Sequence, residues 1–259
     1  MVDLGSYEIV RQIGEGGFGR TYEVKHKLLG TKACLKQNIN VSPENTDILL
    51  KEARVLWDIH HYSLPTLRDF YECKDGSYAL VMSFVEGKTL DAIVEDKTKK
   101  GKALNPEEVC WITQRSLNAL QYLHYHGIIH GDVKPLNIIV NTKEHNATLV
   151  DYGLACVKPK ADTRQAGYTP AFVPPEILDG KPPLPESDLY SLGATMIYAL
   201  GGNPIGKTYP NHVPDKLQEF YDNLVLHEPK NRPKCEDSNL IKELSDLRQE
   251  LFGRRSSQD

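Results

Sequence analysis

The first third of the chain alternates apolar and polar residues with the two-residue period of β-strands. Asp75-Gly76, a dipeptide typical of hairpin turns, separates the last two predicted strands. Ser42-Pro43-Glu44 opens the one helix predicted here, because serine caps helices and proline suits the first turn. Apolar residues then recur at helical spacing, at Leu49, Ala53, Leu56 and Trp57. The predicted strands are 7–13, 21–25, 32–37, 70–73 and 78–82.

After about Glu86 the apolar spacing becomes helical. Asn105-Pro106-Glu107-Glu108 is a strong helix start, because Asn can cap it, Pro suits the first position and acids lie at the positive end of the helix dipole. Gly127 fits the end of that helix. A second hairpin is predicted to pair 138–140 with 147–150, and further helices are predicted at 189–200, 215–226 and 240–251.

Composition indicates a folded chain without the charge of a nucleic-acid-binding protein. Of 259 residues, 40% are hydrophobic, and Lys plus Arg total 31 against 35 for Asp plus Glu, so no nucleic-acid partner is expected. The five cysteines contain no C-x-x-C pair, which argues against zinc or a disulfide framework and for a reducing compartment. We find no membrane segment and no signal peptide in residues 1–6, so we expect a cytoplasmic location.

Glycines cluster at 14–19, in the order Gly14-Glu15-Gly16-Gly17-Phe18-Gly19. Backbone N–H groups can approach phosphate oxygens closely at glycines, because no Cβ intervenes. A Rossmann dinucleotide site would need a helix directly after the glycines, whereas 20–24 has the pattern of a strand. On this segment alone, a plain turn between two strands stays open as well.

Lys36 ends the apolar segment Ala33-Cys34-Leu35-Lys36, where burial of its charge would be unfavourable without a partner. Glu52, on the predicted helix, is a candidate partner. On these two residues alone, the alternative of two solvated side chains is equally open.

Polar residues stand at the open end of the second hairpin. Asn137 just precedes strand 138–140 and Asp151 just follows 147–150. Because an antiparallel hairpin returns its ends to each other, we expect Asn137 and Asp151 to meet there. Carboxylate and amide oxygens are the hard ligands that Mg²⁺ prefers. Asp132 would lie within reach of the same centre, although each acid alone could simply cap a turn.

Together and in this order, these segments resemble the catalytic domain of a eukaryotic-like Ser/Thr protein kinase, over about 7–251. The glycine-rich segment is similar to that of bacterial members. The activation segment of the family corresponds to 151–176. The matching residues are the glycines of 14–19, Lys36, Glu52, His130-Gly131-Asp132 to Asn137, Asp151-Tyr152-Gly153, Pro174-Pro175-Glu176, Asp188 and Arg232.

The resemblance implies an α+β, bilobal protein-kinase-like fold. A small antiparallel β lobe with one main helix would be followed by a larger, mainly helical lobe, with the active site in the cleft between them. The kinase domain would cover 1–259, with the first lobe at about 1–83, a hinge at about 83–88, the second lobe at about 89–251 and a flexible tail at 252–259.

The resemblance also assigns catalytic roles. Lys36, oriented by Glu52, would bind the α- and β-phosphates of ATP. Asp132 would orient the substrate hydroxyl and accept its proton. Lys134 would neutralise the γ-phosphate during transfer, and Thr169 would support Asp132 and Lys134. In the family, Arg232 pairs with Glu176 at the end of the activation segment.

The nucleotide and metal contacts follow from the same resemblance. Asn137 and Asp151 would hold Mg²⁺, or Mn²⁺ in its place. Backbone groups of Ser83 and Val85, after a gatekeeper-like Met82, would bind adenine. The other expected nucleotide contacts are Gly14, Gly16, Gly17, Phe18, Gly19, Thr21, Cys34 and Ile139. Thr21, Cys34 and Ile139 would sandwich the ring. The Cys34 thiol would be buried and inert, or alternatively a handle for covalent inhibitors.

The implied activity is transfer of the γ-phosphate of Mg-ATP to a Ser or Thr hydroxyl of a protein substrate. Gly131 stands where many members carry an arginine that binds a phosphorylated activation-segment residue. We therefore hypothesise that activity does not require such phosphorylation. The alternative is a pseudokinase, which is a nucleotide-binding or scaffold module without phosphate transfer. A pseudokinase usually lacks the counterpart of Lys36, Asp132 or Asp151, and this chain has all three. A small-molecule kinase is disfavoured by Thr169, Glu176, Asp188 and Arg232.

Overall fold

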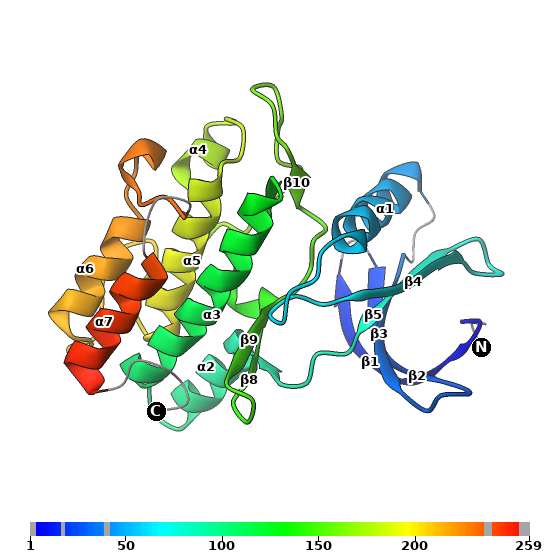
Figure 1. Ribbon diagram of the computed structural model, residues 1–259, viewed down its shortest axis with the longest axis horizontal. Helices are drawn as coiled ribbons and strands as arrows, with labels where there is room; N and C mark the ends of the chain where they lie inside the picture. Colours follow the sequence, from blue (N-terminus) through cyan, green and yellow to red (C-terminus); the bar gives the residue numbers. More distant parts are fainter. Residues whose placement is uncertain (1–3, 17–18, 39–41, 236–239, 254–259) are drawn as a thin grey trace. The chain divides into compact units, whose positions relative to one another are not determined.

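The computed structural model describes residues 4–16, 19–38, 42–235 and 240–253 (Figure 1). The chain divides into two units, Met1–Val85 and Glu86–Asp259. The division falls inside the segment 83–88 that was predicted as a hinge. Each unit is built from a different kind of secondary structure, β-rich in the first and mainly helical in the second.

The first unit is organised around an antiparallel sheet with the strand order β1-β2-β3-β5-β4. Its strands are β1 (Tyr7–Gly16), β2 (Gly19–His26), β3 (Lys32–Gln37), β4 (Leu67–Glu72) and β5 (Tyr78–Ser83). The five predicted strands are therefore confirmed, with β4 beginning three residues earlier. A hydrophobic core of this unit consists of Leu4, Tyr22, Val24, Ala33, Leu35, Cys73, Ala79 and Val81.

Helix α1 (Pro43–Trp57) is the helix predicted for the first unit. The Ser42 side chain accepts a hydrogen bond of 3.2 Å from the backbone nitrogen of Asn45, so serine caps the helix as expected. Leu49 and Leu56 are buried where α1 packs on β4 and β5. Trp57, at the last helical position, is 69% exposed and does not extend this apolar face.

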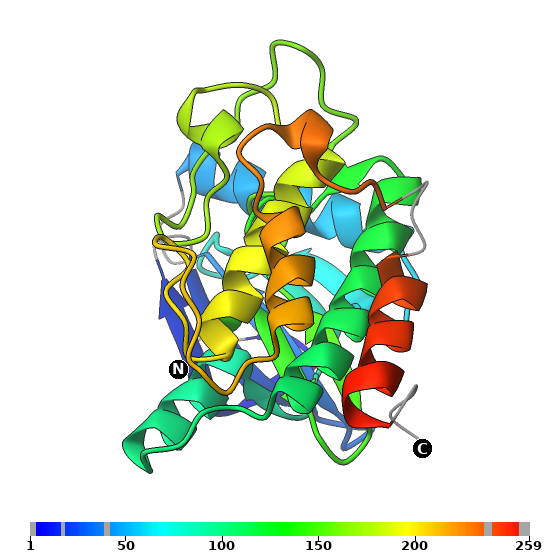
Figure 2. The same ribbon diagram turned by 90° about the vertical axis from the view of Figure 1, so that its left-hand side faces the viewer.

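The second unit packs long helices around α3 (Pro106–Tyr125), which contacts α5, α7 and β9. Its other helices are α2 (Leu90–Lys99), α4 (Pro175–Leu178), α5 (Pro185–Ala199), α6 (Asp215–Leu224) and α7 (Leu240–Phe252). Figure 2 shows α3, α5, α6 and α7 side by side. Asn105 caps α3, as the sequence predicts, and Glu108 completes a capping box with it.

Short strands complete the second unit. The hairpin of β8 (Ile138–Asn141) and β9 (Asn146–Leu149) is confirmed, and β6 (Lys88–Thr89) adds a third strand to it. The strands β7 (Ile128–Ile129) and β10 (Cys156–Val157) pair with each other. Single 3₁₀ turns cover Pro135–Asn137 and Pro229–Asn231. Strands of two residues are too short to show any alternation, which is why the sequence did not predict them.

The helices α2 and α4 were also not predicted. Helix α2 buries only Leu90 and Val94, too few apolar positions to establish a helical period. Of the predicted tail, Phe252 is the last residue of α7, and 254–259 lie outside the described residues. Within the described part of the chain, no helix is both long and apolar enough to cross a membrane.

Candidate active site

Lys36 and Glu52 form a buried ion pair in the first unit. The Nζ of Lys36 lies 2.7 Å from the Oε2 of Glu52, and the two side chains are 12% and 1% exposed. Lys36 comes from β3 and Glu52 from the buried face of α1. Because a buried carboxylate is stable only when it is paired, each side chain fixes the position of the other. The alternative of two solvated side chains is therefore wrong.

The glycine-rich segment joins β1 to β2, and Gly16 is paired with Gly19 where the strands end. A strand follows the glycines, which excludes the Rossmann alternative. A Cβ at Gly19 would lie 2.1 Å from the carbonyl oxygen of Gln37, so packing requires glycine there. A Cβ at Gly16 would meet no described atom within 4 Å, which leaves the backbone open to an approaching anion. Gly17 and Phe18 lie outside the described residues.

The residues expected around adenine lie in different strands. In the first unit, Thr21 is paired with Lys36 across β2 and β3, and Gly14 with Thr21 across β1 and β2. Met82 in β5 is paired with Cys34 in β3. Ile139 lies in β8 of the second unit.

Ser83 ends β5, and its N–H is already used by the protein. This N–H donates a 2.8 Å hydrogen bond to the carbonyl of Thr66, and the Ser83 hydroxyl accepts one of 3.0 Å from the Thr66 N–H. Any hydrogen bond between adenine and the Ser83 backbone is therefore restricted to the Ser83 carbonyl oxygen. Val85, two residues later, is the last residue of the first unit.

The thiol of Cys34 is half-buried in β3. Burial, and to a smaller extent the nearby Glu52 carboxylate, raises the pKa of Cys34 to about 12. The thiolate is the nucleophilic form of cysteine. The structure therefore favours the inert thiol over the reactive handle for covalent inhibitors.

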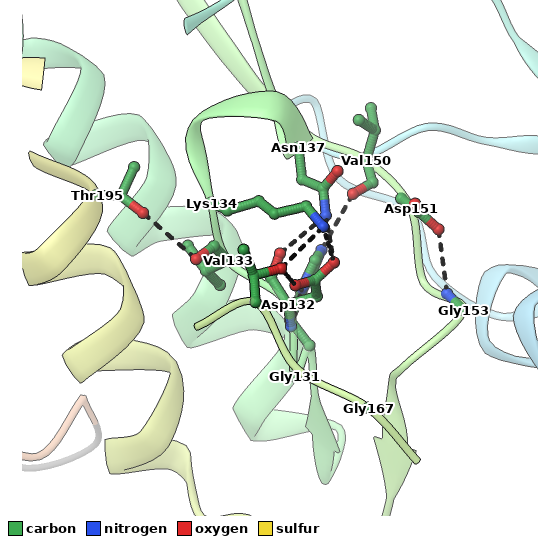
Figure 3. A network of polar contacts seen from close by, with 12 residues as sticks. Gly131, Asp132, Val133, Lys134, Asn137, Val150, Asp151, Gly153, Gly167 and Thr195 are labelled. Carbon is green, nitrogen blue, oxygen red and sulfur yellow. Dashed lines mark hydrogen bonds and ion pairs between the residues drawn. The ribbon is translucent and has the colours of Figure 1, made fainter. Parts of the chain in front are cut away.

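In the second unit, Asp132, Lys134, Asn137 and Thr169 form one hydrogen-bonded group. Figure 3 shows Lys134 and Asn137 directed at Asp132. The Asp132 carboxylate lies 2.6 Å from the Lys134 Nζ and accepts hydrogen bonds from the Thr169 hydroxyl (2.9 Å) and the Asn137 amide (3.0 Å). Thr169 also accepts a bond of 3.1 Å from Lys134. Three donors thus fix both oxygens of a single carboxylate.

Asp151 lies close to this group along the backbone, but its side chain is directed elsewhere. The Val150 N–H donates a 2.9 Å hydrogen bond to the Asn137 carbonyl, so the ends of the β8–β9 hairpin do meet as predicted. The Asp151 carboxylate accepts a hydrogen bond of 3.4 Å from the Gly153 N–H, away from Asp132 (Figure 3). Asp151 has a φ of +67°, a left-handed conformation that aspartate tolerates better than most residues.

The chemistry of Asn137 and Asp151 fits a hard divalent cation. The Asn137 amide nitrogen is engaged by Asp132, and Figure 3 shows its carbonyl oxygen turned away from that carboxylate. One amide oxygen and one carboxylate are the type of donors that suit Mg²⁺ when phosphates and water complete the shell. Among the described residues, no group of three or more His, Cys, Asp and Glu could hold a metal by itself.

A buried carboxylate in helix α5 holds the loop that contains Asp132. The Asp188 carboxylate accepts hydrogen bonds from the backbone N–H groups of His130 (2.8 Å) and Gly131 (2.9 Å). It also lies 2.8 Å from the Nε2 of His124 in α3. Sequence reasoning did not single out His124. Its position four residues after the buried Leu120 was the available signal, because a polar residue on an apolar helix face needs a partner.

His130 links this loop to the segment around Asp151. Its Nδ1 accepts a 3.2 Å hydrogen bond from the Asp132 N–H, and its Nε2 lies 3.3 Å from the Val150 carbonyl. Its ring lies 5.0 Å from that of Tyr152. Nδ1 is thus an acceptor, so the proton is on Nε2 and is donated to Val150.

Glu176 and Arg232 form the pair that the family resemblance implies. Their side chains make two parallel contacts, of 2.7 and 2.8 Å, and both are buried. Ser187 donates a further hydrogen bond of 2.7 Å to Glu176. Burial raises the pKa of Glu176, but the hydrogen bonds from Arg232 and Ser187 outweigh it, so the net shift is downward. The pair anchors the end of the activation segment.

Comparison with known proteins assigns this chain to a known class. The sequence profile of the protein kinase domain matches residues 7–257, nearly the whole chain. The chain therefore belongs to the protein kinase family, as a Ser/Thr protein kinase catalytic domain.

Similar proteins come from eukaryotes and from bacteria. The chain is 27% identical over 91% of its length to the probable serine/threonine-protein kinase nek1 of Dictyostelium discoideum. It is 33% identical over 76% of its length to serine/threonine-protein kinase D of Synechocystis sp., and 28% identical over 87% to serine/threonine-protein kinase PknA of Nostoc sp.. It spans 51%, 41% and 44% of the lengths of these relatives, respectively.

Proposed function

We propose that this protein transfers the γ-phosphate of Mg-ATP to Ser or Thr hydroxyls of a protein substrate. The observation that carries the proposal is the Asp132 carboxylate, which receives three hydrogen bonds or ion contacts from Lys134, Asn137 and Thr169. A carboxylate held this rigidly is suited to orient an attacking hydroxyl and to take its proton, because a general base must be aimed at the proton that it removes.

Each residue then has a distinct task. The substrate hydroxyl attacks the γ-phosphorus while Asp132 accepts the hydroxyl proton. The bond between the γ-phosphorus and the oxygen that bridges it to the β-phosphorus breaks, and ADP leaves. Lys134 lies 2.6 Å from Asp132 and places a positive charge where the transferred group gains negative charge. Thr169 holds Asp132 and Lys134 at the correct spacing, because it contacts both.

The nucleotide is assigned to the glycine-rich segment, Lys36 and the end of β5. Lys36 binds the α- and β-phosphates, and the ion pair with Glu52 determines where its Nζ points. Thr21, Cys34 and Ile139 surround the adenine, and the Ser83 carbonyl and Val85 backbone bind its edge. Asn137 and Asp151 hold Mg²⁺, which supplies charge neutralisation of the phosphates.

Two finer aspects belong to the same proposal. Gly131 carries no side chain to bind a phosphate, so activity does not depend on a phosphorylated activation segment. The reaction takes place in the cytoplasm, which is consistent with five cysteines that form no disulfide.

The proposal is tested with purified chain, radiolabelled ATP, Mg²⁺ and a generic protein substrate. We expect label on Ser and Thr of the substrate, and on the chain itself, as identified by mass spectrometry. The variant Asp132→Asn should lose transfer by about a thousandfold while it keeps its affinity for Mg-ADP, because the base is lost but the nucleotide contacts are not.

The pseudokinase alternative predicts a different pair of results. A pseudokinase would bind Mg-ATP in calorimetry, and both the wild type and Asp132→Asn would leave the substrate unlabelled. Transfer that is equal in the two proteins would instead remove Asp132 from its assigned role.

A further inference from the structure

One side chain joins the carbonyl groups of Gly131 and Gly167. The Nε2 of Gln165 donates a hydrogen bond of 2.7 Å to each of these carbonyls, so both protons of the amide are used. Gln165 and Gly167 lie in the activation segment, and Gly131 lies in the loop that contains Asp132. The amide therefore connects two segments that are 34 residues apart in the sequence.

The two carbonyls lie on either side of the contact between Asp132 and Thr169. Gly131 directly precedes Asp132, and Gly167 lies two residues before Thr169. The Thr169 hydroxyl donates to Asp132 at 2.9 Å. The Gln165 amide thus fixes the backbone on both sides of that hydrogen bond. If the activation segment moved away, the contact of Gln165 with Gly131 and the hydrogen bond from Thr169 to Asp132 would be lost together.

Gly131 leaves no space for a side chain in this arrangement. Its φ is +79°, in the left-handed region that favours glycine. A Cβ there would lie 2.7 Å from the carbonyl oxygen of Leu154 and 3.5 Å from the Oε1 of Gln165. An arginine at 131, which many family members carry, is incompatible with this backbone. The neutral, hydrogen-bonded amide of Gln165 therefore lies next to the position where those family members have an arginine.

The hydroxyl of Thr163 is engaged within its own turn. It accepts a hydrogen bond of 2.8 Å from the Lys160 N–H. The Arg164 guanidinium donates to the carbonyls of Ala161 and Thr163, at 3.3 and 3.0 Å. These contacts are local to 160–164 and, unlike those of Gln165, they do not connect the activation segment to the loop of Asp132.

We propose that Gln165 is a positioning residue, which holds the activation segment against the loop of Asp132 without any phosphate. This inference rests on the proposed kinase function and deepens its regulation. A carboxamide has no proton that titrates near neutral pH and is not phosphorylated by a protein kinase of this class, so the contact requires no modification of Gln165. The residue acts through Asp132 and Thr169 and does not touch the reacting groups.

The test uses the whole chain after phosphatase treatment, with loss of phosphate verified by mass spectrometry. The wild type should keep its kcat after this treatment. Gln165→Glu should lower kcat about tenfold or more, because a carboxylate would face two carbonyl oxygens and donate to neither. The affinity for Mg-ADP should change less than about twofold, since no nucleotide contact is altered.

A pH profile separates positioning from a general structural defect. The ratio of the Gln165→Glu activity to wild-type activity should rise as the pH falls from about 8 to about 5, because the two facing carbonyl oxygens raise the pKa of the introduced carboxyl above its ordinary value of about 4.3 and the protonated form can donate one of the two lost bonds. Gln165→Ala lacks this group, so its ratio should stay low at every pH. Melting temperatures confirm that each variant is folded.

Gln218→Glu is the matched control. Gln218 is also half-buried, and its Nε2 donates a 2.8 Å hydrogen bond to the carbonyl of Val213. Its activity should stay within about twofold of the wild type, without the pH-dependent ratio. The inference is overturned if dephosphorylation abolishes wild-type activity, or if both Gln165 variants keep the wild-type kcat. A wild type that never transfers phosphate would instead refute the proposed function itself.

Discussion

The carboxylate of Asp188 accepts a 2.8 Å hydrogen bond from the backbone N–H of His130, although 58 residues separate them in the sequence. Asp188 lies in the first turn of α5, a helix that is buried along most of its length. His130 belongs to a loop, whose backbone would otherwise be free to move. A packed helix therefore sets the conformation of the loop just before Asp132.

Asp188→Asn should destabilise the chain by about 2–4 kcal/mol in urea unfolding, because the carboxamide has one acceptor oxygen and its NH₂ group would face backbone donors. The kcat should also fall. Asp179→Asn is the control, since Asp179 forms an exposed pair with Lys181, at 2.9 Å, and its loss should cost about 0.5 kcal/mol or less. Equal stabilities for the two variants would contradict the role of Asp188.

Glu52→Gln should lower kcat/KM for ATP by about 10–100-fold, because Lys36 would lose the buried charge that orients it. Steady-state kinetics at varied ATP concentrations measure this effect. Glu44→Gln, in the exposed first turn of the same helix, should leave kcat/KM unchanged. If Glu52→Gln kept the wild-type value, the ion pair would serve folding alone.

The variants Thr169→Val and Thr169→Ser distinguish the effect of the Thr169 hydroxyl on kcat from the effect of the side-chain shape. Valine has nearly the same volume but cannot bond to Lys134 or Asp132, so kcat should fall about 10–100-fold. Serine keeps the hydroxyl and should stay within about threefold of the wild type. Both variants are assayed after phosphatase treatment, which removes any effect of a phosphate at this position. A fully active valine variant would be inconsistent with the assigned role.

The sequence predicted the parts of this site that depend on local pattern. Regular strands placed Lys36, and an evident cap placed the helix that carries Glu52, but their pairing was expected only from the resemblance to the kinase family. The hairpin of 138–150 predicted that Asn137 and Asp151 would lie at one end. The contact of Gln165 with Gly131 could not be predicted in this way, because it depends on the path of an irregular segment, which no periodicity constrains.

Side-chain direction was the other aspect that the sequence did not determine. The hairpin brings the backbones at 137 and 150 together, yet the Asn137 amide turns to Asp132 and the Asp151 carboxylate to Gly153. Asp151 also has a left-handed φ of +67°, which the hairpin pattern does not reveal. Hairpin geometry predicts which residues are neighbours, whereas single backbone angles decide which atoms meet.

Cys34 should react slowly with iodoacetamide. At about pH 8, a pKa near 12 instead of 9 lowers the thiolate fraction about a thousandfold. Mass spectrometry of the native chain over time measures the labelling rate, and the same chain in denaturant gives the reference. Because burial is the larger cause of the shift, Glu52→Gln should leave labelling slow. Rapid labelling of native Cys34 would restore the alternative of a reactive handle.

The pair of Glu176 and Arg232 should make stability depend on pH in the acidic range. The pKa of Glu176 is lower in the folded chain than its ordinary value, chiefly because hydrogen bonds from Arg232 and Ser187 outweigh burial. A carboxyl group of this kind contributes stability that is fully present above its unfolded pKa, about 4.3. The contribution is lost as the pH falls through the lower, folded value.

Glu176→Gln should therefore be less stable than the wild type by about 3–5 kcal/mol near pH 7, because it leaves Arg232 buried without its charge partner. The difference should narrow as the pH falls below about 4, where the wild-type carboxyl is also neutralised. Urea unfolding at a series of pH values measures it, with Glu219→Gln, on the exposed side of α6, as the control. A difference that stayed constant down to the lowest pH at which the chain folds would show that Glu176 is not the titrating group.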